Sequence, residues 1–90
     1  MALVSRDEIG RRLAALSGWE LSGTEIRRIY TFPDFKGSMA FVNRVAALAE
    51  AMDHHPDILI NYSRVTLTLT SHDAGGLTDR DFRLAGQIDS

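Results

Sequence analysis

Apolar residues recur at helical spacing in three stretches of the chain. The first stretch follows Ser5, a hydroxyl residue suited to an N-cap, and predicts a helix over 6–17. The second covers 35–52 and must end before Pro56, because a proline disfavours helical geometry in the residue before it. The third begins at Thr78, a second candidate N-cap. The pattern therefore predicts three helices, one near each end of the chain and one in the middle.

Between these helices the pattern changes to the two-residue period of β-strands. Apolar and threonine side chains alternate over 65–70, which predicts a strand with one buried face and one polar face. By the same parity, His72 belongs to the side that carries the threonines. Less regular stretches rich in β-branched and aromatic residues predict strands over 25–32 and 58–62, and a short extended piece covers 19–21.

The order of these elements is α-β-β-α-β-β-α, which indicates the α+β class. Successive strands are joined by short connections, and no helical crossover joins paired strands, so a four-stranded antiparallel sheet is expected. The three helices then pack on one face of this sheet, and the opposite face holds the threonines. A chain of 90 residues is near the lower limit for a self-sufficient core, so residues 1–90 are expected to form a single domain.

Composition narrows the possible functions. The formal net charge is −2, which leaves no basic surface for nucleic acid or anionic lipid. No apolar run approaches the ~20 residues that a membrane span needs. The N-terminus lacks a basic segment followed by an apolar one, so no signal peptide is expected. The expected location is the cytoplasm, and the absence of cysteine excludes disulfides and cysteine-bound metals.

The helix over 35–52 carries an unusually wide apolar band. Such a band can bury against two surfaces, one of which is the sheet. The other side is either part of a monomer core or an interface of a homodimer or homotetramer. Small side chains would permit close approach of a second copy, and they stand at Ala46, Ala47, Ala49 and Ala51.

Histidine is the residue type most suited to proton transfer near neutral pH, and the chain has 3 histidines. His54 and His55 are adjacent at the end of the middle helix, and the extended chain before Pro56 should point their side chains in different directions. We therefore expect different tasks for the two, such as proton transfer and substrate contact. Whether His72 comes back to this corner depends on the strand register, which the sequence leaves open.

Several other uses of these residues remain open. His54 can act as a cation that complements the C-terminal end of the helix dipole, and His72 can be an ordinary residue at a strand end. Asp81, three residues after Thr78, has the spacing of a capping box and can be a cap alone. Trp19 can belong to the core. A three-histidine metal site is the rival chemistry, but two adjacent histidines do not aim both rings at one ion, so no metal is expected.

The ordered motif residues resemble the signature of the pterin-4a-carbinolamine dehydratases. The resemblance covers nearly the whole chain, and Ser71 stands where that family favours threonine. The matching positions are Glu50, His54, His55, Pro56, Tyr62, His72 and Asp81, with Gly18-Trp19, Phe32-Pro33-Asp34-Phe35, Thr70-Ser71-His72-Asp73 and Gly76-Leu77-Thr78 around them.

The resemblance implies dehydration of a 4a-hydroxytetrahydropterin to a quinonoid dihydropterin, in support of tetrahydrobiopterin recycling and without a cofactor. It implies that His54 and His72 transfer protons, with either one as acid, and that Asp81 lies near His72 and holds its ring. His55 is expected to orient the pterin. Trp19 and Pro56 are expected to line the substrate pocket, and Glu50 is expected to support the His54 region.

The resemblance also implies partners and an alternative function. An aromatic amino acid hydroxylase would supply the substrate. Relatives in animals act as dimerisation cofactors of a transcription factor, and some bacterial relatives look like assembly factors, so a protein-binding scaffold is the alternative to an enzyme. The intact set of histidines favours the enzyme, because a scaffold has no need of them.

Overall fold

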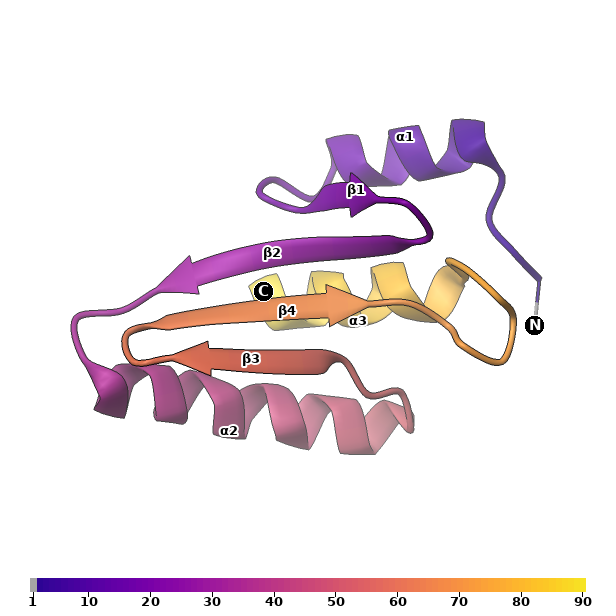
Figure 1. Cartoon of the computed structure of the whole chain (residues 1–90). Helices are drawn as coiled ribbons and strands as arrows, with labels where there is room; N and C mark the ends of the chain where they lie inside the picture. The colour runs from indigo at the N-terminus through magenta and orange to yellow at the C-terminus, as the bar shows by residue number, and fades with distance from the viewer. Residues whose placement is uncertain (1) are drawn as a thin grey trace.

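The computed structural model describes residues 2–90, and it has the α-β-β-α-β-β-α order that the sequence predicts. Figure 1 shows α1 on the β1 side of the sheet and α2 on the β3 side, with α3 between them. The elements are α1 Arg6–Ala14, β1 Glu20–Ser22, β2 Glu25–Thr31, α2 Phe35–Met52, β3 Asp57–Asn61, β4 Arg64–Leu69 and α3 Asp79–Asp89.

The four strands form one antiparallel sheet in the order β1-β2-β4-β3. Cross-strand pairs such as Ile26 with Leu69 put the apolar side chains of the central strands on a single face. Thr66 and Thr68 point to the opposite face, as the alternation over 65–70 predicts. The antiparallel α+β fold is therefore confirmed.

The core lies between that apolar face and the helices. Side chains from β2, β4, α2 and α3 make one buried cluster, and α1 adds only partly buried residues to it. Because all helices contribute to the cluster on one face, the predicted layering is confirmed. The buried members of the strands and long helices are Ile26, Val65, Leu67, Leu69, Val45, Ala49, Phe82, Leu84, Ala85 and Ile88.

The first helix is shorter than predicted. Apolar spacing predicts a helix over 6–17, but α1 ends at Ala14, and the N–H groups of Ala15 and Leu16 donate to carbonyls three residues back. This tight last turn keeps Leu16 against the core without continuing the α-helix. Apolar spacing alone does not separate a 3₁₀ turn from a helical one.

Within residues 2–90, no helix combines the length and hydropathy that crossing a bilayer requires. The cytoplasmic location stays a prediction.

Candidate active site

One pocket brings together all 3 histidines of the chain. Its volume is about 330 Å³, and it opens where α2 ends and where the chain leaves β4. The lining residues are Asp53, His54, His55, Thr70, His72, Asp73 and Arg80. Strand register, which the sequence leaves open, therefore does return His72 to the His54-His55 corner.

The end of α2 determines how the adjacent histidines point. Asp53 has left-handed backbone geometry (φ 50°) and donates its N–H to the carbonyls of Ala49 and Glu50, which caps the helix. The next residue, His54, donates its backbone N–H to Ala49 at 3.1 Å and turns inward, where it is 7% exposed. The side chain of His55 turns outward and is 55% exposed. The side chains of His54 and His55 therefore point in different directions, as predicted.

His54 is held by a carboxylate that has no exposure to solvent. Its Nε2 lies 2.5 Å from Oδ1 of Asp81, and Asp81 is 0% exposed. Because a carboxylate only accepts hydrogen bonds, this contact assigns the ring hydrogen of His54 to Nε2. The other ring nitrogen, Nδ1, has no partner among the described residues and stays accessible.

Asp81 is fixed by further donors. Its Oδ2 accepts the backbone N–H of Thr78 at 2.9 Å, as a capping box requires, and the hydroxyl of Ser71 at 2.8 Å. Asp81 is therefore both a helix cap and the partner of a pocket histidine. The resemblance implies that Asp81 holds the ring of His72, and this expectation is wrong. The Asp81 carboxylate bonds to His54, Ser71 and Thr78, because α3 begins beside the end of α2.

His72 lies in the turn that follows β4, and its side chain is exposed. The neighbouring residue, Asp73, accepts a hydrogen bond from Nη2 of Arg80 at 2.7 Å, which lowers the pKa of the Asp73 carboxyl. The Nε of Arg80 is buried and has no partner within residues 2–90. The His72 side of the pocket thus carries one fixed cation next to one carboxylate.

Three other predicted site residues lie differently from expectation. Glu50 accepts from Nε2 of His55 at 2.5 Å, so it supports His55 and not the His54 region. Pro56 is partly buried but does not line the pocket. Trp19 is 5% exposed in the core, and its indole N–H donates to Asp89 at 2.7 Å, so the expectation that it lines the pocket is corrected.

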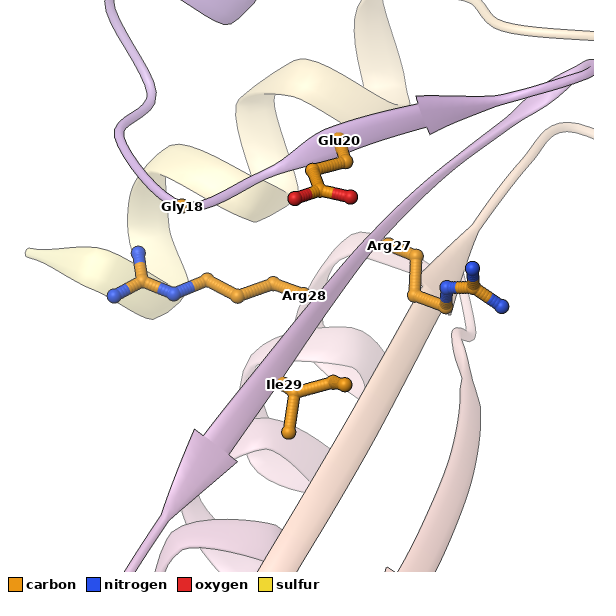
Figure 2. Close-up of a pocket in the computed structure, with 5 residues that line it drawn as sticks. All are labelled: Gly18, Glu20, Arg27, Arg28 and Ile29. Carbon is orange, nitrogen blue, oxygen red and sulfur yellow. The ribbon is translucent and has the colours of Figure 1, made fainter.

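A second concavity, of about 250 Å³, is lined by residues of β1, β2 and the loop before β1. It shares no lining residue with the histidine pocket. Figure 2 shows Arg27 and Arg28 leaving β2 on opposite sides, with Glu20 of β1 above them. A Cβ at Gly18 would meet the Arg28 guanidinium at 2.7 Å, so this glycine lets Arg28 reach Asp89. Among the side chains here, Arg28 holds the end of α3 to the sheet through Asp89, and the concavity contains no histidine.

Nor do the histidines form a metal centre in this structure. Within the described part of the chain, no three His, Cys, Asp or Glu side chains gather as ligands of one ion.

The pocket also contains residues that sequence reasoning missed. Asp53, Thr70, Asp73 and Arg80 line it, and Ser71 supports it from behind. Adjacency to His54 could have found Asp53, and the stretch Thr70-Ser71-His72-Asp73, which is part of the family resemblance, could have found its other three residues. Arg80 directly precedes Asp81, but its approach to the pocket follows from the packing of α3.

Comparisons with known proteins agree with this geometry. The family model for pterin 4 alpha carbinolamine dehydratase matches residues 2–90. A relative from Roseiflexus castenholzii, named for that dehydratase, is 54% identical over 98% of this chain and 95% of its own length. A relative from Acidobacterium capsulatum with the same name is 52% identical over 100% of this chain and 98% of its own.

Two solved structures are also similar. A transcriptional coactivator/pterin dehydratase from Brucella melitensis superposes with a TM-score of 0.93 at 33% identity, covering 98% of this chain and 96% of that one. A pterin dehydratase-like RuBisCO assembly factor of the alpha-carboxysome has a TM-score of 0.64 at 22% identity, covering 79% and 82%, and shows the fold alone. The full-length matches establish that this chain belongs to the pterin-4a-carbinolamine dehydratase family.

Proposed function

We propose that this chain is a hydro-lyase that dehydrates a 4a-hydroxytetrahydropterin to the quinonoid dihydropterin, with residues 1–90 acting as one domain. The observation that carries the proposal is the pocket of about 330 Å³ lined by His54, His55 and His72. A second support is the match of residues 2–90 to the family that is named for this reaction. A flat bicyclic ring needs a pocket of this order of size.

The reaction requires two proton transfers. The N5 lone pair forms a double bond to C4a, and the C4a–O bond breaks. A base takes the proton from N5, and an acid protonates the departing oxygen, so that water leaves. Positioned side chains contribute roughly 10²–10⁴-fold to such a step, and neither a metal nor a covalent intermediate is needed.

His54 is the proposed base. Its Nε2 hydrogen is engaged by Asp81, so the lone pair of Nδ1 is the one available to substrate. When Nδ1 takes the N5 proton, the ring becomes a cation next to a buried carboxylate that stabilises it. A carboxylate behind a histidine base fixes the ring tautomer in the same way in the catalytic triads of hydrolases.

His72 is then the proposed acid for the leaving hydroxyl. It approaches the pocket from the turn after β4, whereas His54 approaches from the end of α2, so the two can flank one ring. His55, held by Glu50, is proposed to orient the pterin. Arg80 lines the pocket and is held by Asp73 through Nη2, so its guanidinium is the fixed cation of the pocket and a suitable partner for the pterin carbonyl.

Two partners belong to this proposal. An aromatic amino acid hydroxylase is the proposed source of the hydroxylated pterin. The chain is also proposed to form a homodimer or homotetramer through the outer side of α2 and the edge strand β3. Support comes from the exposure of small residues along α2 at Ala46, Ala47 and Ala51, and from the edge position of β3 in the sheet.

The test is a stopped-flow assay of dehydration with freshly generated carbinolamine. His54→Ala and His72→Ala are each expected to lower kcat about 100-fold, because each removes a positioned proton-transfer group. His55→Ala is the matched comparison, and its expected effect is mainly on KM. Full activity in both the His54 and His72 variants, with the fold intact by circular dichroism, would refute the mechanism. A wild-type protein without dehydratase activity would refute the function.

A further inference from the structure

Ser71 connects the two halves of the histidine pocket. Its side chain is 1% exposed, and its hydroxyl donates to Oδ2 of Asp81 at 2.8 Å. The same carboxylate holds His54 through Oδ1, and His72 directly follows Ser71 in the chain. The buried Asp81 carboxylate therefore contacts both the ring of His54 and Ser71, the residue that precedes His72.

The Ser71 hydroxyl has only one hydrogen to donate, and this decides which group is the donor in each of its hydrogen bonds. That hydrogen goes to Asp81, which as a carboxylate only accepts. In the contact of 2.8 Å between the hydroxyls of Ser71 and Thr78, Thr78 must therefore be the donor. The result is a chain from Thr78 to Ser71 to Asp81, in which each bond polarises the next in a buried environment.

The backbone of Ser71 is fixed as firmly as its side chain. Its N–H donates to the carbonyl of Gly76 at 3.0 Å, and its own carbonyl accepts from Ala74 and Gly75 at 3.0 Å each. The turn that carries His72 is closed by these bonds. A displacement of Ser71 therefore moves the start of that turn, and with it the attachment point of His72.

We propose that Ser71 is a positioning residue of the dehydration reaction. Its hydroxyl locks the Asp81 carboxylate in the orientation that holds the His54 ring, and the same bond fixes the separation between His54 and His72. This inference rests on the proposed function for its kinetic consequences, whereas its structural consequence for the His54 ring can be measured without substrate.

The kinetic test compares three serine variants of the full chain. Ser71→Ala is expected to lower kcat roughly tenfold, with a smaller change in KM, because the loss of one bond to a charged group misaligns the proton-transfer pair. Ser71→Thr keeps the hydroxyl and is expected to restore most of kcat. Ser63→Ala, at the opposite end of β4 and without a side-chain hydrogen bond among residues 2–90, is the matched control and should behave as wild type.

A second variant removes the other end of the hydrogen-bond chain. Thr78→Val keeps the shape of the side chain but loses the hydroxyl that donates to Ser71, and an intermediate loss in kcat of about threefold is expected. This arm remains informative if Ser71→Ala fails to fold.

The structural test uses nitrogen and proton magnetic resonance of the His54 ring. In the wild type, the Nε2 proton should be visible and protected from exchange with water, and in Ser71→Ala it should exchange faster. Because a fall in overall stability also speeds exchange through global unfolding, the exchange rate of the Nε2 proton is compared with that of backbone amides in the core, which should change less.

Two results would overturn the inference. One is wild-type kcat in a folded Ser71→Ala protein. The other is a wild-type His54 ring protonated on Nδ1 instead of Nε2. A wild-type chain without any dehydration would count against the proposed function instead, and the resonance measurement would still decide the placement of His54 by Ser71.

Discussion

At the scale of single residues, Asp81 shows how one carboxylate can select the chemical form of a histidine. Its two oxygens have different neighbours: Oδ2 accepts from Ser71 and Thr78, and Oδ1 faces His54. Both neighbours of Oδ2 are donors, so only an oxygen can occupy that position. The atom in the Oδ1 position therefore decides which nitrogen of His54 carries the hydrogen.

Asp81→Asn exploits this asymmetry. The amide oxygen must take the place of Oδ2, so the NH2 group faces His54 and forces Nε2 to accept. The ring hydrogen then moves to Nδ1, and the proposed base loses its lone pair. We expect kcat to fall by ~10²–10⁴-fold, the usual contribution of a positioned base; the equivalent change in a catalytic triad costs about 10⁴-fold.

The measurement for Asp81→Asn is kcat together with the ring tautomer of His54 by nitrogen resonance. Asp79→Asn, at an exposed carboxylate two residues earlier that pairs with Arg12, is the matched control and should keep both properties. An Asp81→Asn enzyme with wild-type kcat and a hydrogen on Nδ1 would show that His54 is not the base.

The contacts between site residues are the part of the structure that the sequence predicts least well. The types and order of His54, His72 and Asp81 are visible in the sequence, and the structure brings them to one corner. Their pairing is not visible, because His54 and Asp81 are 27 residues apart and meet only through the packing of α3 against the end of α2. The same reason explains why Arg80 was missed.

At the scale of elements, the C-terminal end of α3 is attached to the sheet by a single carboxylate. Asp89 is the last residue of α3, where a negative charge opposes the helix dipole. Three donors compensate for it: the indole of Trp19 at 2.7 Å, the guanidinium of Arg28 at 3.0 Å and the hydroxyl of Tyr30 at 2.5 Å. Burial, together with the bond to Asp89, raises the pKa of the Tyr30 hydroxyl well above its usual value.

This raised pKa predicts a loss of stability at alkaline pH. The unfolded chain releases the Tyr30 proton near pH ~10, whereas the folded chain keeps it, so the contribution of Tyr30 is complete below that pH and declines above it. Tyr30→Phe should lower the free energy of unfolding at pH 7, because a bond to Asp89 is lost. The difference between the wild type and Tyr30→Phe should then shrink as the pH rises above ~10.

Urea unfolding between pH 7 and 11 measures this difference. Tyr62→Phe, at a tyrosine that is 66% exposed, is the matched control. A gap between wild type and Tyr30→Phe that stays constant or widens above pH ~10 would contradict the prediction.

Elements were predicted better than sites, for a physical reason. The period of the hydrophobic positions shows which face of a segment is buried. This was enough to predict β4 from its alternation and α2 from its apolar band. It does not report where a helix tightens into a 3₁₀ turn, as after Ala14, or which core contact an isolated aromatic residue such as Trp19 will make. Those details depend on segments distant in sequence.

At the scale of the whole molecule, α2 is a long helix that is buried on one side only. Its inner side reaches the core through Val45 and Ala49, but Ala46, Ala47 and Ala51 on other sides are exposed. A helix of 18 residues with small exposed side chains allows a second helix to approach closely. Light scattering of the wild type is therefore expected to give two or four times the monomer mass of 10.0 kDa.

Ala47→Glu tests whether α2 forms that contact. A carboxylate buried without a partner between two packed helices is costly, so the variant should shift the mass toward that of one chain at concentrations where the wild type is assembled. Ala14→Glu places the same charge on an exposed position of α1 and should leave the mass unchanged. A wild-type mass of one chain would contradict the proposed oligomer itself. If the mass is unchanged in Ala47→Glu, the interface does not involve α2. Because β3 is an edge strand, the sheet edge would then be the interface.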